Sequence, residues 1–236
     1  MFSNSAQYYD DIYASIDKNY AAEARKTHRF IRKHKASSGK RLLDVACGTG
    51  IHAGLLAKYY QVEGLDLDPE MLSVARKKHP EIPFQQGDMV DFVLRSQFDA
   101  IVCLFSSIGY VRTRTRLRKA LRNMSAHLLP GGVLLVEPWF TPEQWHVGYV
   151  GLVSMDKPDL RIVRMSRGAK KRGVSILEFE YLIGTPKGIT HLSETHELGL
   201  FEEQDYLEAF RLAGLQVIHD PEGLDGRGLY VGVKPH

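Results

Sequence analysis

Two stretches decide the fold of this chain: LLDVACGTG at residues 42–50 and EGLDLDPEML at residues 63–72. In the first, a short apolar run leads directly into Gly48 and Gly50, which predicts a buried strand that ends in a tight turn. Glycines suit such a turn because they tolerate unusual backbone angles and let a ligand approach where a Cβ would stand. In a doubly wound sheet, Asp66 of the second stretch lies at the tip of the neighbouring strand, where a carboxylate accepts hydrogen bonds from ribose hydroxyls. The pair therefore predicts a site for an adenosine-containing cofactor.

The spacing of the glycines separates two kinds of cofactor site. Read from Gly48, the pattern G-x-G-x-x-A ends at Ala53 and is an accepted variant of the dinucleotide fingerprint. The longer run DVACGTG, residues 44–50, resembles instead the D-x-G-x-G-x-G loop of class I S-adenosylmethionine-dependent methyltransferases. Ala46 stands where that family usually has its first glycine. This departure predicts a slightly different approach to the methionine end of the cofactor, not its loss.

The resemblance continues in order beyond the glycine loop. QGDM at 86–89 looks like the segment that holds the adenine, and FDAIV at 98–102 looks like the fourth strand of that family. LLPGGVLLV at 128–136 looks like the turn into the fifth strand. The resemblance implies an α/β fold, a Rossmann-like doubly wound sheet of seven strands, with S-adenosylmethionine as the cofactor and no metal.

Apolar periodicity predicts the remaining elements. Helices are expected at Tyr20–His34, His52–Tyr60, Pro69–Lys78, around Phe92, at Leu117–His127 and at Glu203–Ala213. Strands are expected near Phe84 and at Ala100–Phe105, Val133–Glu137, Gln216–His219 and Gly228–Val233.

After Pro138 the pattern changes from helical periodicity to strict alternation. Ser175–Ile183 and Thr190–Leu200 alternate apolar and polar residues, which predicts an antiparallel hairpin inserted after the fifth strand. We assign residues 1–138 and 201–236 to a cofactor-binding core and residues 139–200 to a cap on the substrate side. A hairpin that only extends the sheet, or that makes a dimer contact, is the alternative.

Composition is consistent with a single-domain enzyme. The 236 residues are 44% hydrophobic, enough for one substantial core. A net charge of +3 gives no general argument for nucleic acid or membrane binding. No apolar run approaches the roughly 18 residues that span a bilayer, and the N-terminal sequence does not resemble a secretion signal. The two cysteines, Cys47 and Cys103, are interpreted as small buried thiols. A cytoplasmic location is expected.

Shorter motifs narrow the resemblance to one subgroup. FSSIGY at 105–110, EPWF at 137–140, GITH at 188–191 and GRGLY at 226–230 look like the N-methyltransferases that act on nucleotide-linked amino sugars in the desosamine and mycaminose pathways. Those enzymes methylate a 3-amino-deoxyhexose attached to dTDP twice, so the resemblance implies a dimethylated amine as product. It also implies a set of cofactor contacts: Tyr9, Tyr20, Asp44, Ala46, Gly48, Gly50, Asp66, Asp88, Met89 and Leu104.

Substrate contacts are expected from Trp139, Arg164 and Arg227. Guanidinium groups bind phosphate oxygens in bidentate fashion, so the two arginines are the basis for a diphosphate substrate. Where the subgroup has His-Ser after an Arg-x-Ser motif, this chain has Arg167-Gly168, which leaves the sugar-phosphate contacts and the identity of the substrate open.

Methyl transfer to an amine requires a neutral nitrogen lone pair, whereas a sugar amine is mostly protonated at pH 7. Ser107, Tyr110 and Glu137 are the catalytic candidates because they are expected at strand ends that face the cofactor. None is assigned as an obligatory base, because orientation supplies most of the rate enhancement in such reactions.

Other interpretations stay open. The basic stripe VRTRTRLRKALR at 111–122 is typical of RNA-binding surfaces, but it lies on a predicted helix in a chain of small net charge, so a solvated helix and no nucleic acid are expected. His127, His191 and His196 show no metal-ligand spacing. Alternative functions are methylation of a glycine-like or sarcosine-like amine or of a hydroxyl, and a non-catalytic cofactor-binding partner protein. A homodimer is a further expectation.

Overall fold

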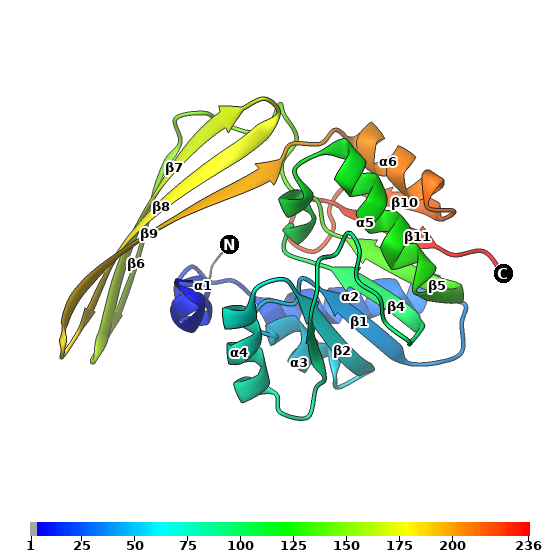
Figure 1. The fold of residues 1–236 in the computed structure, drawn as a ribbon, viewed down its shortest axis with the longest axis horizontal. Helices are drawn as coiled ribbons and strands as arrows, with labels where there is room; N and C mark the ends of the chain where they lie inside the picture. The colour runs from blue at the N-terminus through cyan, green and yellow to red at the C-terminus, as the bar shows by residue number, and fades with distance from the viewer. Residues whose placement is uncertain (1–3) are drawn as a thin grey trace.

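A computed structural model describes residues 4–236, which form two β-sheets and flanking helices (Figure 1). The strands are β1 (Arg41–Val45), β2 (Gln61–Asp66), β3 (Phe84–Gln86), β4 (Phe98–Cys103), β5 (Leu128–Val136), β6 (Val150–Lys157), β7 (Leu160–Lys171), β8 (Val174–Thr185), β9 (Gly188–Gly199), β10 (Gln216–Asp220) and β11 (Leu229–Val233). The helices are η1 (Ala6–Tyr8), α1 (Tyr9–Ala14), α2 (Tyr20–His34), α3 (Ile51–Leu56), α4 (Pro69–Lys78), η2 (Ser107–Val111), α5 (Arg114–Ala126) and α6 (Glu203–Leu212).

The larger sheet has seven strands in the order β10-β11-β5-β4-β1-β2-β3. The five strands from β5 to β3 are parallel, whereas β11 and β10 run antiparallel to their neighbours. The strand order reverses direction at β1, which places the carboxyl ends of β1 and β4 at a topological switch point, where ligands of such sheets bind. The Rossmann-like, doubly wound sheet expected from the sequence is confirmed.

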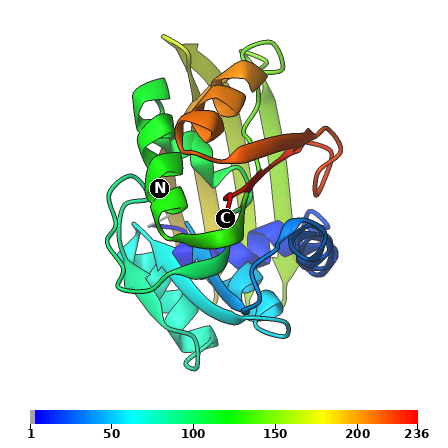
Figure 2. The same cartoon turned by 90° about the vertical axis from the view of Figure 1, so that its right-hand side faces the viewer.

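Alternation of side chains along the central strands builds the two layers of the core. Leu42 faces a cluster that includes α2, α3 and α4, and Leu43, the next residue, faces a cluster that includes α5 and α6. Figure 2 shows α5 and α6 on one side of the larger sheet and α2 on the other. Because each strand is buried on both faces, its sequence is nearly continuous in apolar residues, as parallel sheets require.

Side-chain caps explain where two of the cofactor-side helices begin. The Asn19 side chain accepts a hydrogen bond from the Ala22 amide at the start of α2, and Asp68 accepts one from the Glu70 amide at the start of α4. Pro69 occupies the first turn of α4, where its missing N–H costs no hydrogen bond. The Asp68 cap fixes the chain directly after the end of β2, which carries Asp66.

The smaller sheet has four antiparallel strands in the order β6-β7-β8-β9, whereas the sequence predicted only the hairpin now seen as β8 and β9. The strand β6 escaped prediction because most of its residues are exposed and only Met155 is buried. The strand β7 escaped prediction because Arg164 occupies one of its buried positions and breaks the apolar alternation.

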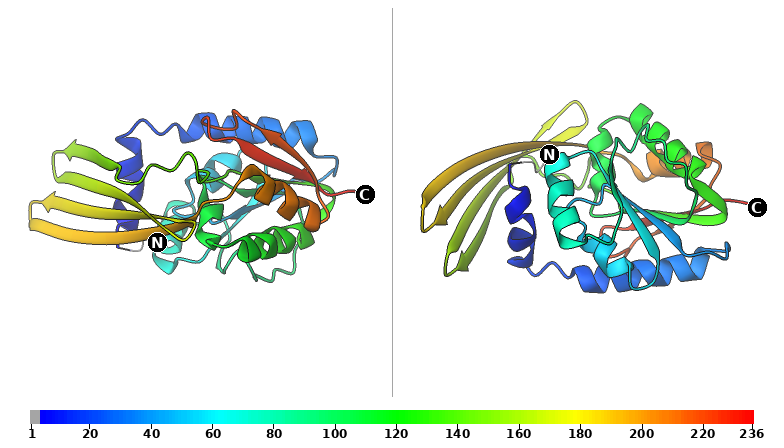
Figure 3. Two further views of the ribbon diagram at one scale, coloured as in Figure 1. Left: turned by 90° about the horizontal axis from the view of Figure 1, so that it is seen from above. Right: turned by 60° about the horizontal axis from the view of Figure 1, so that its bottom comes forward.

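The helix α1 lies between the two sheets (Figures 1 and 3). Its Ile12 packs against the inner face of the smaller sheet, among Met155, Ile162 and Tyr181. On the other side, Asp10 accepts a hydrogen bond from the Thr49 hydroxyl in the glycine loop. This short helix therefore contacts both sheets at once.

Two sequence predictions need comment. The helix expected around Phe92 is absent, because residues 87–97 form a turn in which Asp88 accepts a hydrogen bond from the Val90 amide.

Among the described residues, no helix is long and apolar enough to cross a membrane. The cytoplasmic location stays a prediction.

Candidate active site

A cavity of about 710 Å³ lies between the carboxyl ends of the parallel strands, the N-terminal helices and the smaller sheet. Most of the residues predicted for cofactor, substrate and catalysis line this one cavity: Tyr9, Tyr20, Asp44, Ala46, Gly48, Asp66, Asp88, Met89, Leu104, Ser107, Tyr110, Trp139, Arg164 and Arg227. Gly50 and Glu137 do not line it.

The glycine loop follows β1 and presents its backbone to the cavity. Gly48 has a φ of +55°, and a Cβ added there would meet nothing within 4 Å, so its backbone faces open space. Gly50 has a φ of +76°, but a Cβ there would lie 3.0 Å from the Phe84 ring. The two glycines therefore serve different needs: Gly48 permits the approach of a ligand, and Gly50 permits close packing behind the loop.

Ala46 also adopts the left-handed conformation, with a φ of +59°. An L-residue pays a steric cost of roughly 1–2 kcal/mol there, whereas glycine does not. The position that departs from the family pattern therefore keeps the backbone shape of a glycine.

Asp66 is held at the tip of β2 by two backbone hydrogen bonds. Its carboxylate accepts the Gly48 amide at 2.7 Å and the Asp68 amide at 2.9 Å. Burial raises the pKa of Asp66, and the backbone hydrogen bonds partly oppose that rise. Asp44, at the end of β1, is buried beside it, and burial followed by the charge of Asp66 raises the pKa of Asp44 to about 8. Two carboxyl groups thus face the same region of the cavity.

The far end of this region is formed by the turn after β3. Asp88 accepts a hydrogen bond from Arg116 of α5 at 2.7 Å, and Met89 packs partly buried against the core. This end of the region thus presents an apolar side chain beside a carboxylate that accepts hydrogen bonds.

Aromatic side chains from the N-terminal segment close the cavity over the glycine loop. Tyr9 and Tyr13 of α1 lie 4.6 Å apart between ring centroids, and Tyr13 packs edge-on against Phe105 at 5.0 Å. Tyr20, the first residue of α2, packs against His52 at 5.2 Å. The Tyr20 hydroxyl is buried without a hydrogen-bond partner among the described residues. Such electron-rich rings suit a neighbouring cation.

The donor set fits S-adenosylmethionine. A backbone that faces open space at Gly48, a carboxylate at the tip of β2 and the buried, unpartnered Tyr20 hydroxyl match an adenosine ligand with a charged methionine end. Neither metal clusters nor disulfides enter this site: no group of three or more metal-binding side chains occurs in residues 4–236, and Cys47 and Cys103 are buried, free thiols.

The smaller sheet contributes a buried cation to the other end of the cavity. Arg164 is only 7% exposed, and its Nε and Nη1 atoms have no hydrogen-bond partner among the described residues. Its guanidinium lies 4.7 Å from the Phe179 ring centroid and 5.5 Å from that of Tyr13. A buried charge with unpartnered donors is costly unless a ligand completes it.

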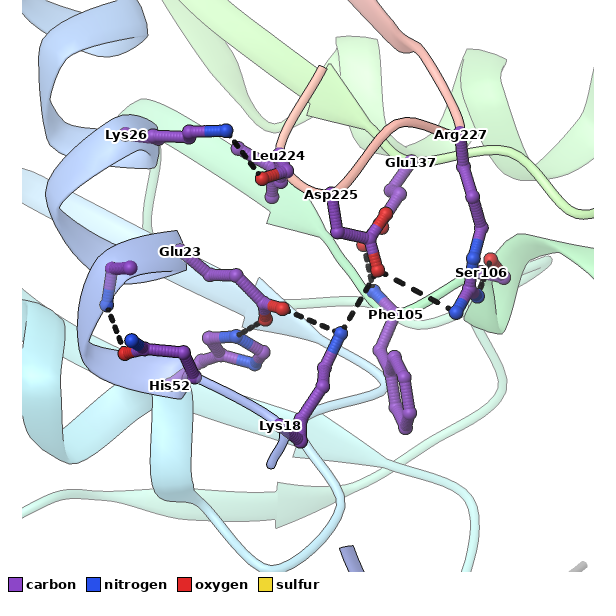
Figure 4. A network of polar contacts seen from close by, with 12 residues as sticks. Lys18, Glu23, Lys26, His52, Phe105, Ser106, Glu137, Leu224, Asp225 and Arg227 are labelled. Carbon is purple, nitrogen blue, oxygen red and sulfur yellow. Dashed lines mark hydrogen bonds and ion pairs between the residues drawn. The ribbon is translucent and has the colours of Figure 1, made fainter. Parts of the chain in front are cut away.

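Arg227 lines the cavity and belongs to a polar network with Ser106, Asp225 and Lys18 (Figure 4). Its Nη1 donates to the Ser106 hydroxyl at 3.0 Å, and its Nη2 lies 3.5 Å from Asp225. Lys18 bridges Asp225 at 3.2 Å to Glu23. The guanidinium is thus fixed in place, in contrast to the freedom that its glycine-flanked loop suggested.

Glu137 takes a different place from the one expected. It is fully buried in the same network, where its carboxyl accepts a hydrogen bond from the Phe105 amide (Figure 4). Phe105 and Ser106 both have positive φ, so this hydrogen bond braces a strained turn at the end of β4. Burial, and then the charge of Asp225, raise the pKa of Glu137 to about 8. Glu137 therefore supports the wall of the cavity without facing it.

Several lining residues were missed by sequence reasoning. Phe105 and Phe140 lay inside motifs that had been quoted without assigning them a role, and Tyr13 stands one helical turn after Tyr9, a spacing that could have indicated it. Phe179 and His196 reach the cavity only because β8 and β9 fold back over the core, a placement that no local pattern contains.

Four arginines of the basic stripe form ion pairs with acidic partners. Arg112 pairs with Glu197, Arg114 with Asp205, Arg116 with Asp88 and Arg118 with Glu208. The arginines of α5 and its preceding loop thus connect the helix to neighbouring elements.

The fold, the glycine loop and the carboxylate at the tip of β2 define a class I S-adenosylmethionine-dependent methyltransferase. A family model described as a methyltransferase domain matches residues 42–132. The dTDP-3-amino-3,6-dideoxy-alpha-D-glucopyranose N,N-dimethyltransferase of Streptomyces fradiae is 40% identical over 97% of this chain and 90% of its own length. The chain belongs to the same family of S-adenosylmethionine-dependent methyltransferases as that enzyme.

Solved structures agree. Streptomyces venezuelae DesVI superposes with a TM-score of 0.92 at 38% identity, covering 98% of both chains. CalS10 from Micromonospora echinaspora, an amino pentose methyltransferase solved with S-adenosylmethionine bound, superposes with a TM-score of 0.86 at 37% identity and covers 96% of both chains. The predictions of fold, enzyme class and cofactor are confirmed.

Proposed function

We propose that this enzyme transfers two methyl groups to the amine of a dTDP-linked 3-amino-deoxyhexose. The observation that carries the proposal is the single cavity that joins the glycine loop to Arg164, the buried arginine with unpartnered donors on the smaller sheet. A diphosphate supplies acceptor oxygens for the Nε and Nη1 donors of this guanidinium, which have none among the described residues. The S. fradiae relative, named for such a sugar, supports the same substrate class.

The cofactor end is assigned to the residues of the core. We assign the ribose hydroxyls to Asp66, the adenine to Asp88 and Met89, and the methionine end to the glycine loop and the N-terminal tyrosines. S-adenosylmethionine supplies a methyl group on a positively charged sulfur. Gly48 and Ala46 shape the backbone of the loop, and Leu104 completes the wall beside them.

The substrate end is assigned to residues 139–200, which we propose act as a cap on the core. Arg164 and Arg227 bind the diphosphate, and Trp139 forms an apolar wall, fixed by donation from its Nε1 to the Ser175 hydroxyl at 2.9 Å. Arg167 does not contribute, since it is exposed and paired with Glu178 at 2.7 Å.

Ser107 and Tyr110 border the junction of the two ends, so they are placed to orient the amine. The nitrogen must stand about 3 Å from the methyl carbon and in line with the carbon–sulfur bond. Rigid positioning of this kind needs neither a metal nor a covalent intermediate. Glu137 is assigned a supporting role because it lies behind the wall.

The test is incubation with S-adenosylmethionine and dTDP-3-amino-3,6-dideoxyglucose, followed by mass spectrometry of the sugar. We expect a gain of one and then two methyl groups, and inhibition by added dTDP. Methylation of glycine or sarcosine in preference to the sugar would contradict the substrate assignment. Cofactor binding without any methylation of the amines tested would favour a non-catalytic partner protein.

We also propose a homodimer through the outer face of the smaller sheet. Leu152, Val163, Met165 and Leu182 are exposed on this face and lie in adjacent rows of the strand register. An exposed apolar patch of this kind is typical of an interaction surface. Sedimentation of wild type and of Leu182→Glu tests the proposal: the variant should be a monomer. We propose no nucleic-acid partner, because Arg114, Arg116 and Arg118 of α5 are paired with carboxylates.

A further inference from the structure

A histidine lies behind Tyr110, on the wall of the cavity. Tyr110 is in η2, and its hydroxyl forms a hydrogen bond with Nδ1 of His196 on β9 at 2.8 Å. The other ring nitrogen of His196 faces Glu194, two residues earlier on the same strand, with Nε2 3.6 Å from Oε2. Tyr110 and His196 both line the cavity, whereas Glu194 lies behind them.

Glu194 is anchored as a carboxylate. It accepts hydrogen bonds from the amides of Asn4 and Ser5 at 3.0 Å each, from the Ser5 hydroxyl at 2.8 Å and from the Tyr181 hydroxyl at 3.2 Å. Burial alone would raise its pKa, but the nearby His196 imidazole and the hydrogen bonds from Ser5 outweigh burial and lower it. A fixed negative charge therefore stands on one side of the imidazole.

His196 is placed to be neutral at pH 7. Burial lowers its pKa, and Glu194 only partly opposes this, while the Arg164 guanidinium lowers the pKa further. Burial raises the pKa of Tyr110, so its hydroxyl stays protonated. In the tautomer that fits these contacts, the neutral imidazole of His196 carries its proton on Nε2, directed toward Glu194. Nδ1 then accepts a hydrogen bond from the Tyr110 hydroxyl.

The substrate amine poses a problem that this arrangement solves. A primary or secondary sugar amine is mostly an ammonium ion at pH 7, and an ammonium ion has no lone pair for the methyl group. The proton must leave before each of the two transfers. Tyr110 and His196 line the cavity here, so side chains of the protein are in place to take up this proton.

We propose that Tyr110, His196 and Glu194 form the proton relay that deprotonates the substrate ammonium. One N–H bond of the ammonium breaks as its proton bonds to the Tyr110 oxygen. The Tyr110 O–H bond breaks as that proton bonds to His196 Nδ1, and the new imidazolium is stabilised by the Glu194 carboxylate. The proton leaves to solvent after the product departs. Tyr110 touches the substrate, whereas His196 and Glu194 act through it; the relay rests on the proposed amine methylation.

The test is His196→Asn, because an asparagine amide can keep a hydrogen bond to Tyr110 but cannot take up a proton. At pH 7, kcat should fall by about 10- to 100-fold with KM for the sugar nearly unchanged. The loss should shrink as pH rises toward the pKa of the free amine, and added imidazole should restore part of the rate. Glu194 is left unmutated because it also holds the N-terminal segment.

His219→Asn is the matched control. His219 also faces a carboxylate, Glu203 at 3.4 Å, and also contacts a tyrosine, stacking on Tyr230 at 4.4 Å, but it does not line the cavity. Its variant should keep wild-type kcat. A readout independent of turnover is the ¹⁵N NMR spectrum of His196, which should show the neutral Nε2–H tautomer at pH 7.

The outcomes separate the two proposals. Wild-type activity on the sugar with an undiminished His196→Asn variant would overturn the relay and leave the proposed function intact. The same holds for a pH-independent loss, or for an imidazolium form of His196 at pH 7. Failure of the wild type to methylate any amine, with the cofactor bound, would overturn the proposed function and the relay together.

Discussion

The two sides of the cavity are built in different ways. The core side presents backbone: the left-handed turn after β1 and a carboxylate held by the Gly48 and Asp68 amides. The cap side presents long side chains, above all Arg164, from the face of an antiparallel sheet. A site made of backbone is fixed by local turn geometry, whereas a site made of side chains is fixed by how distant strands pack. The first tolerates little change, and the second can be altered one residue at a time.

The largest effect is expected from a change to the backbone side. Gly48→Val places a branched side chain in open cavity space at positive φ, so the Kd for S-adenosylmethionine should rise by about 100-fold or more, or roughly 3 kcal/mol. Isothermal titration calorimetry measures this.

Gly214→Val is the control, because Gly214 has a φ of +77° and also meets nothing within 4 Å, but lies outside the cavity. It should show the same loss of thermal stability with unchanged cofactor affinity. Equal cofactor affinity in both variants would contradict the different role assigned to Gly48.

The second-largest effect is expected from a change to Arg164 on the cap side. Arg164→Met keeps an unbranched side chain and removes the guanidinium and its charge, so KM for the dTDP-sugar should rise by about 10- to 100-fold, as expected for a lost hydrogen bond to a charged group. Because the guanidinium is buried with unpartnered donors, the variant should be as stable as wild type or more stable.

Steady-state kinetics measure KM and thermal unfolding measures the stability of the Arg164→Met variant. The cofactor Kd should not change. A strongly destabilised variant with a normal KM would show that Arg164 is a structural residue.

The stability of the protein should depend on pH through Glu137, which lies behind the cavity wall. The pKa of Glu137 is raised to about 8, so the folded protein holds its proton between pH 5 and pH 8, where the unfolded chain releases it. Stability from this group is therefore present at low pH and is lost as pH rises toward 8. Glu137→Gln mimics the protonated acid and should raise stability at pH 8 relative to wild type by on the order of 2 kcal/mol.

Thermal unfolding from pH 5 to pH 9 checks this, with Glu197→Gln as the control because Glu197 forms an exposed pair with Arg112. The two proteins should converge near pH 5. A benefit of Glu137→Gln that is independent of pH would contradict the protonated state.

The smallest effect concerns Ala46. Glycine removes the steric cost of its left-handed conformation, but glycine also loses more conformational entropy on folding. Ala46→Gly should therefore stabilise the protein by at most about 1 kcal/mol. Ala57→Gly, at an ordinary φ of −59°, should instead destabilise it by about 0.5–1 kcal/mol. Chemical denaturation of both variants measures the difference; equal signs would contradict the strain at position 46.

The same contrast explains what could be predicted from the sequence. The strand, turn and carboxylate of the core follow from residues close together in the chain, so their elements were predicted correctly in type, and all the predicted cofactor residues except Gly50 line one cavity. The strand β7 was not predicted, because Arg164 occupies one of its buried positions. The position of Glu137 was not predicted either. Whether its side chain faces the cavity or lies behind the wall depends on the strained turn at Phe105 and Ser106. The place of His196 at the cavity was not predicted, because it reaches the cavity only when β8 and β9 fold back over the core.

The short helix between the two sheets bears on how the protein should be handled. Asp10 ties it to the glycine loop, Lys157 ties its Asp11 to the smaller sheet at 2.7 Å, and the amides just before it, at Asn4 and Ser5, are held by Glu194. We therefore expect a fusion partner ahead of Asn4 to disturb this anchored segment and the site behind it. The opposite end of the chain, at His236, lies on the far side of the larger sheet from the smaller one (Figure 1). Affinity tags and immobilisation linkers therefore belong at the carboxyl terminus.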